Sequence, residues 1–306
     1  MKKSSVKTPH RRRRSPAPSI FLALVVVLCL FFGWMHLQAR MTRLCPAEVY
    51  LPDLPRALDG TRVLYISDFK LQSAAEARSA GKLMRRLQEL APDLLLLGGD
   101  YCGSSVLDSL NGTANVALPD YVADFIASLA DFPAPMGKFA VAGDSDGDPR
   151  TLAAAFQAAG VNCLADSAVT VSKNGADMSI AGLTDRSLNR NGSAKLSRSY
   201  HRDDCVLVLA HNPTSYIDVR VSEAEGGGAW ADLVLAGHTL GGQINVLGRT
   251  LRSFSPEEQR TLSGWFYPND LPLLVSEGLG CDGAPLRLGS NSQIHLLILR
   301  RQEIVN

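Results

Sequence analysis

Paired cysteines are missing from this 306-residue sequence, which has six cysteines but no Cys-x-x-Cys motif. Cys29 lies in an apolar N-terminal segment, and the spacing of the other five matches neither a zinc motif nor a disulfide framework. We therefore expect small buried apolar side chains, and no cross-links, at Cys45, Cys102, Cys163, Cys205 and Cys281.

A basic face is also missing. Residues 1–14 carry seven Lys and Arg and no acidic residue, whereas the whole chain has 31 basic and 30 acidic residues. The remainder therefore has 24 basic against 30 acidic residues, a net charge near −6. Proteins that bind nucleic acid show a basic surface, so we expect no nucleic-acid partner. The run Arg11 to Arg14 directly precedes an apolar segment and therefore indicates membrane topology.

That apolar segment predicts a membrane anchor. No charged residue interrupts Ile20 to Met35, and Leu37 extends the run to about 18 residues, the short end of what spans a bilayer. With the basic flank before it, the pattern predicts a cytoplasmic tail over 1–18, a transmembrane signal anchor over 19–38, and a large extracytoplasmic domain on a single-pass protein of the cell membrane. A cleaved signal peptide is the alternative, although no clear Ala-x-Ala site follows the segment.

The remaining chain predicts an α/β domain. Residues 39–59 contain three prolines and indicate a linker with an entry strand, followed by one domain over 60–306. Strand and helix patterns alternate in the first half, which predicts parallel pairing, and the strand-rich second half predicts a further mixed sheet. We expect strands at 62–67, 93–97, 138–142, 161–164, 169–172, 178–181, 205–210, 232–236, 273–276 and 294–299, helices at 75–90, 119–130, 151–159 and 213–219, and long loops at 101–118 and 183–202.

A polar residue follows the end of an apolar strand pattern at five places. In open α/β sheets, ligands bind beyond the carboxyl ends of the strands, so these side chains can converge on one crevice. A single Asp after a strand is most often a turn or cap residue, but five such ends in series indicate a site. The five residues are Asp68, Asp100, Asp144, His211 and His238.

The order and spacing of these segments resemble the calcineurin-like metallophosphoesterases, in particular their membrane-associated bacterial branch. That family carries D-x-H, G-D, G-N-H-D/E, a lone His and G-H-x-H in this order. The corresponding segments are Ser67-Asp68-Phe69-Lys70, Gly98-Gly99-Asp100, Gly143-Asp144-Ser145-Asp146, Ala210-His211-Asn212-Pro213 and Gly237-His238-Thr239-Leu240-Gly241-Gly242-Gln243, with a similar tail at 275–280 and 285–287.

The resemblance implies a four-layer α-β-β-α sandwich, two mixed sheets flanked by helices. It also implies two metal ions that share one Asp and activate water against a phosphate ester. Mixed carboxylate and imidazole ligands suit Mn, Fe or Zn better than Mg or Ca. Carried over by position, the metal ligands are Asp68, Asp100, Asp144, His211 and His238.

Three histidines of the family pattern are replaced in this chain, by Lys70, Ser145 and Leu240, and Asp144 stands where the family has Asn. One metal position keeps four ligands, whereas the other keeps only Asp68 and the shared Asp100, because a lysine cation and a leucine cannot coordinate a metal. We therefore expect one ion where the family has two. Serine is a poor general acid at neutral pH, so Ser145 weakens the expected chemistry.

Three functions are compatible with these residues. The first is a membrane-anchored, metal-dependent phosphoesterase in which Asp100, Asp144, Ser145 and Lys70 take part in catalysis. The second is a weak or inactive pseudoenzyme that binds or regulates, and the third is a structural membrane protein without a ligand. The retained ligands disfavour the third, and the first is our leading prediction. Its substrate would be a phosphoester, and the anchor makes a lipid-linked one plausible.

Lys70 allows two interpretations. It follows Asp68 by two residues, on the loop where the family places a metal ligand. It is either a solvated surface lysine or an ammonium group that occupies the vacated cation position. In the second case its charge would relieve repulsion among neighbouring carboxylates.

Overall fold

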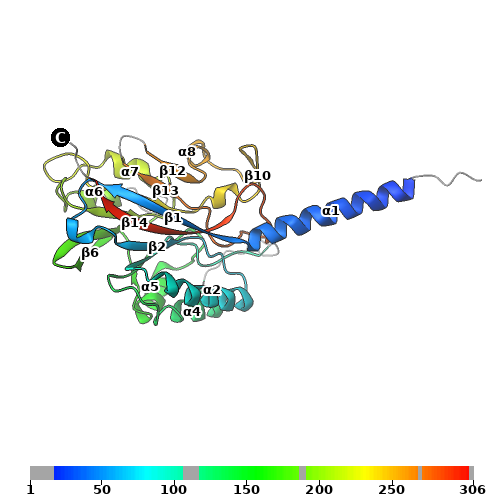
Figure 1. Cartoon of the computed structure of the whole chain (residues 1–306), viewed down its shortest axis with the longest axis horizontal. Coiled ribbons are helices and arrows are strands. Elements are labelled where there is room, and N and C mark those ends of the chain that lie inside the picture. The colour runs from blue at the N-terminus through cyan, green and yellow to red at the C-terminus, as the bar shows by residue number, and fades with distance from the viewer. Residues whose placement is uncertain (1–16, 106–116, 186–190, 268–270, 303–306) are drawn as a thin grey trace, which may run out of the picture.

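The computed structural model describes residues 17–105, 117–185, 191–267 and 271–302. These residues form two six-stranded sheets packed face to face, helices on the outer side of each sheet, and one long helix that projects from one end (Figure 1). The α/β fold expected from the sequence, two mixed sheets flanked by helices after one apolar N-terminal helix, is confirmed.

The first sheet combines parallel and antiparallel pairs. Its order is β1-β14-β2-β3-β4-β5, in which β1 runs parallel to β14, β14 runs antiparallel to β2, and the remaining neighbours are parallel. Its strands are β1 Thr42–Leu51, β14 Ser292–Arg301, β2 Arg62–Ile66, β3 Leu94–Leu97, β4 Gly137–Ala140 and β5 Asn162–Cys163.

The second sheet has the order β12-β13-β9-β8-β7-β6, with parallel pairs in the middle and an antiparallel pair at each edge. Its strands are β12 Gly264–Phe266, β13 Leu273–Val275, β9 Leu233–Ala236, β8 Val206–Leu209, β7 Ala176–Gly182 and β6 Ser167–Lys173. A separate two-stranded ribbon pairs β10 Asn245–Val246 with β11 Arg249–Thr250.

Helices cover both outer faces (Figure 1). The first sheet packs against α2 Ala74–Leu87, α4 Asp120–Ala127 and α5 Pro149–Ala158, and the second against α6 Gly192–Ser197 and α7 Ser215–Val221. Short helical turns are η1 Arg56–Leu58, η2 Gln88–Leu90, η3 Leu240–Gly242 and α8 Pro256–Arg260. The starts of α2 and α5 follow from their sequences, because Ser73 and Asp148 each accept hydrogen bonds from the first turn as N-caps.

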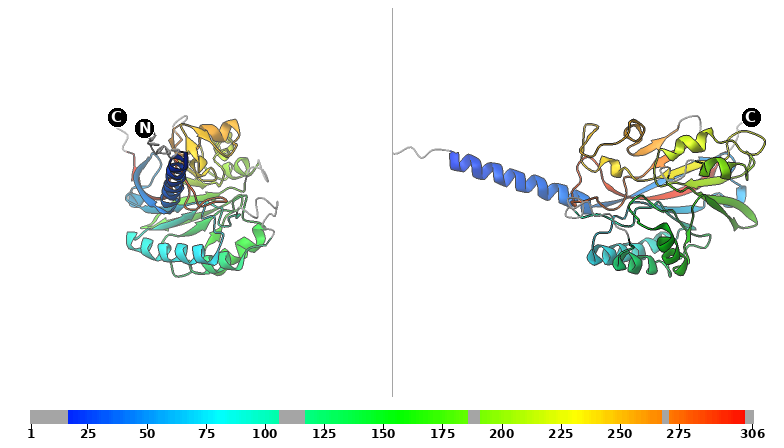
Figure 2. Two further views of the ribbon diagram at one scale, coloured as in Figure 1. Left: turned by 90° about the vertical axis from the view of Figure 1, so that its right-hand side faces the viewer. Right: turned by 180° about the vertical axis from the view of Figure 1, so that it is seen from behind.

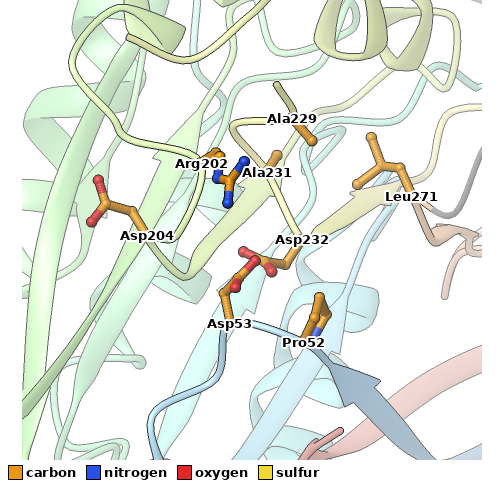
Figure 3. A pocket seen from close by; sticks show the side chains of 8 residues that line it. All are labelled: Pro52, Asp53, Arg202, Asp204, Ala229, Ala231, Asp232 and Leu271. Carbon is orange, nitrogen blue, oxygen red and sulfur yellow. The ribbon is translucent and has the colours of Figure 1, made fainter. Parts of the chain in front are cut away.

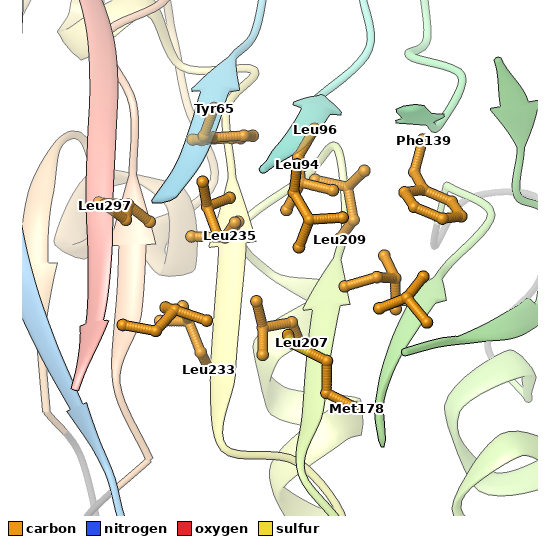
Figure 4. Close-up of a cluster of buried hydrophobic side chains, with 14 of the residues drawn as sticks. Tyr65, Leu94, Leu96, Phe139, Met178, Leu207, Leu209, Leu233, Leu235 and Leu297 are labelled. Carbon is orange, nitrogen blue, oxygen red and sulfur yellow. The ribbon is translucent and has the colours of Figure 1, made fainter. Parts of the chain in front are cut away.

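The four leucines of β3 show how one apolar run serves two cores. Leu94 and Leu96 point into the layer between the sheets, where they lie opposite the leucines of β8 and β9 (Figure 4). Leu95 and Leu97 point to the other face and pack against the helices. Side chains alternate between the faces of a strand, and a parallel strand buried on both faces has no polar side. Each fully buried leucine stabilises the fold by about 1.5–3 kcal/mol.

The N-terminal region contains more regular structure than expected. The segment 39–59, expected as a linker with an entry strand, contains β1, which pairs with β14 over its whole length from Thr42 to Leu51. The folded sheet thus begins inside the expected linker.

One of the expected long loops contains a helix. Helix α6 lies within 183–202, which was expected to be a loop, so that expectation is wrong for Gly192–Ser197. Residues 106–116 and 186–190 of the expected loops lie outside the described residues.

Helix α1, Ala17–Arg40, is joined directly to this sheet. An 18-residue window within Ser19–Arg40 has a mean hydropathy of 2.6, and the described side chains of the helix are mostly exposed. Only the last turns contact the domain: Met35 is buried, the His36 ring lies 3.1 Å from the Pro285 carbonyl, and Gln38 donates to the Ser290 carbonyl at 3.1 Å. By length and composition α1 is able to span a membrane.

The topology places the carboxyl ends of β2, β3 and β4 at the same end of the domain as α1. β1 starts two residues after α1 ends, β14 runs parallel to β1, and β2 runs antiparallel to β14. The strands β2, β3 and β4 are parallel to one another, so they all end where β1 begins.

Candidate metal centre

Four of the five expected side chains converge at that end of the sheets. Asp100 and Asp144 follow β3 and β4, and His211 and His238 follow β8 and β9. Each offers one ligand atom, and these atoms all lie within 4.8 Å of one another. Asp100 and both histidines are buried, whereas the Asp144 side chain is 43% exposed and faces solvent. The two packed sheets thus bring one Asp–His cluster together.

The backbone around this cluster adopts unusual conformations. Asp68, Asp100 and His238 have φ values of 53°, 59° and 71°, in the left-handed region that residues with a Cβ rarely adopt. Conformations of this kind cost about 1–3 kcal/mol each and concentrate at functional sites. Two positions at the site require glycine because neighbouring segments approach them closely. A Cβ on Gly143 would overlap Asp100, and a Cβ on Gly237 would overlap Asp68.

The main chain fixes the orientation of His211. Its Nδ1 lies 2.8 Å from the Gly98 carbonyl, which can only accept, so Nδ1 carries the proton and donates it. Nε2 lies 3.0 Å from Asp144 Oδ1 and 3.3 Å from Asp100 Oδ2. Burial would lower the pKa of His211, but the neighbouring carboxylates raise it well above its usual value, so Nε2 also carries a proton until a metal ion replaces it. This arrangement is the one that metal-binding histidines adopt.

His238 is oriented by a residue that the sequence analysis did not single out. Glu258 of α8 places Oε1 3.2 Å from Nε2, which leaves Nδ1 facing Asp144 Oδ1 at 3.0 Å and His211 Nε2 at 3.3 Å. Asn212 also donates to Glu258. The sequence does signal α8, because Ser255 and Glu258 form a capping box, but no spacing rule links that helix to His238.

Asp146 is a second residue that was not assigned a role. It is buried, and its two carboxylate oxygens accept from the backbone N–H groups of Asp100, Tyr101, Cys102 and Gly143 at 2.7–3.0 Å. Its carboxylate therefore joins the loop after β3 to the loop after β4. This connection sets the relative positions of Asp100 and Asp144.

Asp68, the fifth expected ligand, lies beside the cluster and is not part of it. Both of its carboxylate oxygens accept from the His238 backbone N–H, at 3.0 and 3.1 Å. Leu240 is buried nearby, since a Cβ on Gly278 would meet both Leu240 and Asp68. In this half of the site, Leu240 therefore places an apolar side chain near Asp68 where the family pattern has a histidine.

Lys70 is buried in the same half of the site. Its side chain is 2% exposed, its Nζ lies 2.5 Å from Asp100 Oδ2, and it donates to the Ser145 hydroxyl at 2.7 Å. The interpretation as a solvated surface lysine is therefore wrong. The ammonium group and the four-residue cluster share Asp100, the carboxylate that bridges two ions in the family pattern.

The charges at the site stabilise one another. Burial by itself would raise the pKa of Asp100, but the positive charges of His211 and Lys70 hold it below its usual value. Burial would also lower the pKa of Lys70, yet the carboxylates of Asp100, Asp282, Asp144 and Asp68 raise it. Lys70 is therefore a cation at neutral pH, and Asp100 is an anion.

The donor set fits a divalent transition metal. Two imidazole nitrogens and two carboxylates match the ligands that Zn, Fe and Mn accept. Both rings are held by second contacts that point a ring nitrogen into the cluster. No other group of three or more His, Cys, Asp or Glu in the described segments comes close enough to share an ion.

A separate hollow of about 190 Å³ lies at the opposite ends of the strands (Figure 3). Asp232, directly before β9, and Asp53, just after β1, line it with their carboxyl groups next to each other. Burial raises the pKa of Asp232 to about 7 and also raises that of Asp53. The pair therefore retains a proton near neutral pH, and the hollow offers no histidine that could bind a metal.

A family model described as "Calcineurin-like phosphoesterase" matches residues 61–242, more than half of the chain. The protein therefore belongs to the calcineurin-like phosphoesterases, as the resemblance predicted. The match spans all five of the strand ends that carry the expected Asp and His residues.

Relatives include membrane-associated proteins. The uncharacterised metallophosphoesterase YkoQ of Bacillus subtilis is 26% identical over 90% of this chain and 97% of its own length. A bovine transmembrane protein with a metallophosphoesterase domain is 25% identical over 91% of this chain and 62% of its length. The UDP-2,3-diacylglucosamine pyrophosphatase LpxG of Chlamydia muridarum is 30% identical over 40% of this chain and 34% of its length. Among solved structures, a dimetal phosphatase from Danio rerio gives a TM-score of 0.43 at 9% identity, over 72% of this chain and 88% of that one.

We predict that Glu258→Gln lowers metal affinity about 10–100-fold, the usual effect of losing a group that orients a metal-binding histidine. Glutamine can keep the hydrogen-bond geometry of the capping box but lacks the charge that holds the His238 ring. Glu257→Gln, at the exposed neighbouring position of α8, is the matched control. Competition with a chelator measures both affinities, and equal values for the two variants would contradict the assigned role.

Proposed function

We propose that this protein is a membrane-anchored phosphoesterase that uses one divalent transition metal ion, Mn, Fe or Zn. The observation that carries the proposal is that Asp100, Asp144, His211 and His238 offer ligand atoms within 4.8 Å of one another, while the buried Lys70 ammonium group lies 2.5 Å from Asp100. The family match supports a phosphoester as substrate.

A metal ion held by the four ligands would supply Lewis-acid stabilisation of the phosphoryl charge and a nucleophile made from water at neutral pH. The chain's own residues would bind and orient the substrate. The Lys70 ammonium attracts an anionic phosphoryl group, as a point charge. Asp100 keeps that ammonium in place and also accepts the Ser145 backbone N–H at 2.9 Å, which fixes the loop after β4.

At the position from which the family protonates the leaving group, this chain has no strong general acid. Ser145 stands at the position of the family's catalytic histidine, and its hydroxyl accepts a hydrogen bond from Lys70. A general acid typically contributes about 10²–10⁴-fold to a rate. We therefore propose a substrate whose leaving group needs no proton, such as the phosphate of a phosphoanhydride.

The proposed substrate is also lipid-linked. The topology supports this, because the carboxyl ends of β2, β3 and β4 lie at the end of the domain from which α1 leaves (Figures 1 and 2). A site at that end is close to any molecule held in the same membrane. The name of LpxG, a pyrophosphatase of a diacylated nucleotide sugar, supports the same combination of lipid and anhydride.

A pseudoenzyme that binds a phosphorylated ligand is the second candidate. The three replacements Lys70, Ser145 and Leu240 favour it, because together they remove one metal position and the general acid. Such a protein would keep the metal and the ammonium group for binding and would not turn over its ligand.

We predict one tightly bound metal ion per purified chain and metal-dependent hydrolysis of an aryl phosphodiester. His211→Ala should lose both, because it removes a buried ligand, whereas Asp68→Asn should keep the ion. His201→Ala, at an exposed histidine, is the control. Elemental analysis and a chromogenic ester provide the readouts. Two tight ions per chain would contradict the assignment, and one ion without hydrolysis would favour the pseudoenzyme.

We predict that Lys70→Ala destabilises the fold by about 3–5 kcal/mol, because it leaves the charge of Asp100 buried without its partner. Since the folded pKa of Asp100 is depressed, the ion pair contributes stability above the unfolded pKa, and this contribution is lost as pH falls through the folded pKa. Lys70→Ala should therefore be most harmful at neutral pH and least harmful in acid. Lys82→Ala, at an exposed lysine of α2, is the control in thermal unfolding at several pH values.

A combined Lys70→His, Ser145→His and Leu240→His variant tests whether these three replacements removed the second metal position. It restores the family pattern, so it should bind a second ion and hydrolyse the chromogenic ester faster. If Lys70→Ala were neutral at every pH and in substrate binding, the role of the ammonium group would be refuted.

We also propose that α1 anchors the protein in the cell membrane, with its basic tail in the cytoplasm and the domain outside. Arg11 to Arg14 support this orientation. Protease added to spheroplasts should digest the domain and spare an N-terminal tag until the membrane is permeabilised. Protection of the domain together with digestion of the tag would reverse the proposed orientation.

A further inference from the structure

The β10–β11 ribbon, residues 245–252, departs from the usual rules for a hairpin. Leu247 and Gly248 join its two strands and have φ values of 53° and 82°. A two-residue turn with both φ values positive strongly favours Asn-Gly or Asp-Gly. A leucine at the first position is strained, and this leucine is also 100% exposed. Local rules broken in this way indicate a function.

Apolar and basic side chains gather on this ribbon. Leu247 and Leu251, at 100% and 78%, are the most exposed of the large apolar side chains in the described part of the chain, and Val246 is 52% exposed. Arg249 and Arg252 are exposed beside them. Apolar tips flanked by cations are typical of segments that lie in a membrane interface among anionic headgroups.

The ribbon is attached to the segment on which α1 docks. His36 and Gln38 of α1 contact the carbonyls of Pro285 and Ser290. Leu288 lies between Pro285 and Ser290 in the sequence. Its backbone N–H donates to the Gln243 carbonyl at 2.9 Å, and its carbonyl accepts from the Asn245 N–H at 2.7 Å. Figures 1 and 2 show β10 at the end of the domain from which α1 leaves.

No spacer separates the domain from a membrane that α1 would cross. The apolar run from Ile20 to Leu37 is about 27 Å long at 1.5 Å per residue. The hydrocarbon core of a bilayer is about 30 Å thick, so the run is slightly shorter than the core that it would cross. Because His36 and Gln38 already contact the domain, the surface around them must lie at the bilayer interface.

We propose that the exposed apolar side chains of this segment, Val246 and Leu247 at the turn and Leu251 directly after β11, insert into the interface of the same bilayer that α1 spans. Arg249 and Arg252 would then lie among the headgroups. The proposal rests on the proposed anchoring by α1. The ribbon follows His238 through η3, so a second membrane contact would hold the metal centre at a fixed height and tilt above the lipid surface.

The test uses tryptophan fluorescence of the full chain in nanodiscs of phosphatidylcholine and phosphatidylglycerol, with and without brominated lipid. In a Trp34→Phe background, which keeps Trp230 and Trp265, the emission that Leu247→Trp adds to that of the background reports on the ribbon. Val221→Trp is the control, a 65% exposed site at the end of α7, which lies toward the other end of the domain (Figure 1). We expect brominated lipid to reduce emission at position 247 and not at 221, with a shorter-wavelength emission maximum at 247.

The unsubstituted chain, compared with Trp34→Phe, reports on α1 separately. If brominated lipid quenches Trp34 but not a tryptophan at position 247, membrane anchoring by α1 is supported and the ribbon proposal is overturned. If lipid does not quench Trp34, both are overturned. Leu247→Asn provides a check on folding: it suits the turn, so the unfolding temperature in detergent should stay equal or rise. A clear fall would show that Leu247 serves the fold and would overturn the proposal.

Discussion

The buried contact between Lys70 and Asp100 is the interaction on which the rest of the site depends. Asp100 is fully buried, and its charge is costly unless it is paired. Lys70 pairs with one of its oxygens and Ser145 donates a backbone N–H to the other, while His211 also approaches it. Without a cation at this place, the carboxylates of Asp68, Asp100 and Asp144 would repel one another. We propose that the lysine substitutes for one of the two ions of the family pattern and thereby keeps the rest of the site in shape.

Much of the fold could be predicted from the sequence, because it rests on apolar runs such as Leu94 to Leu97 and on the capped helices between them. The short strands β10 and β11 could not, since two residues show no periodicity. Strand β1 could not be recognised as part of the sheet from its sequence either. Its solvent-facing polar residues and Pro46 resemble a linker, and only its ten-residue pairing with β14 makes it part of the sheet.

The candidate site was predictable where a residue type follows a strand end, and not where it depends on the approach of distant segments. Asp100, Asp144, His211 and His238 are visible in the sequence because each follows an apolar run. Glu258 reaches His238 from a separate short helix, and Asp146 acts through four backbone N–H groups that no spacing rule brings together. The burial of Lys70 was likewise open from the sequence, because its loop offers polar neighbours whether the side chain points inward or outward.

The direction of one strand determines which end of the domain a membrane would meet. Because β1 begins directly after α1 and runs parallel to β14, and because β14 opposes β2, the ligand-bearing ends of β2, β3 and β4 share an end with α1. Had β1 paired antiparallel to β14, the same helix would leave from the opposite end, near Asp53 and Asp232. The observed register therefore brings the candidate metal centre, the docking segment 285–290 and the β10–β11 ribbon to one end of the domain, which is the end that the proposed membrane-linked substrate would meet.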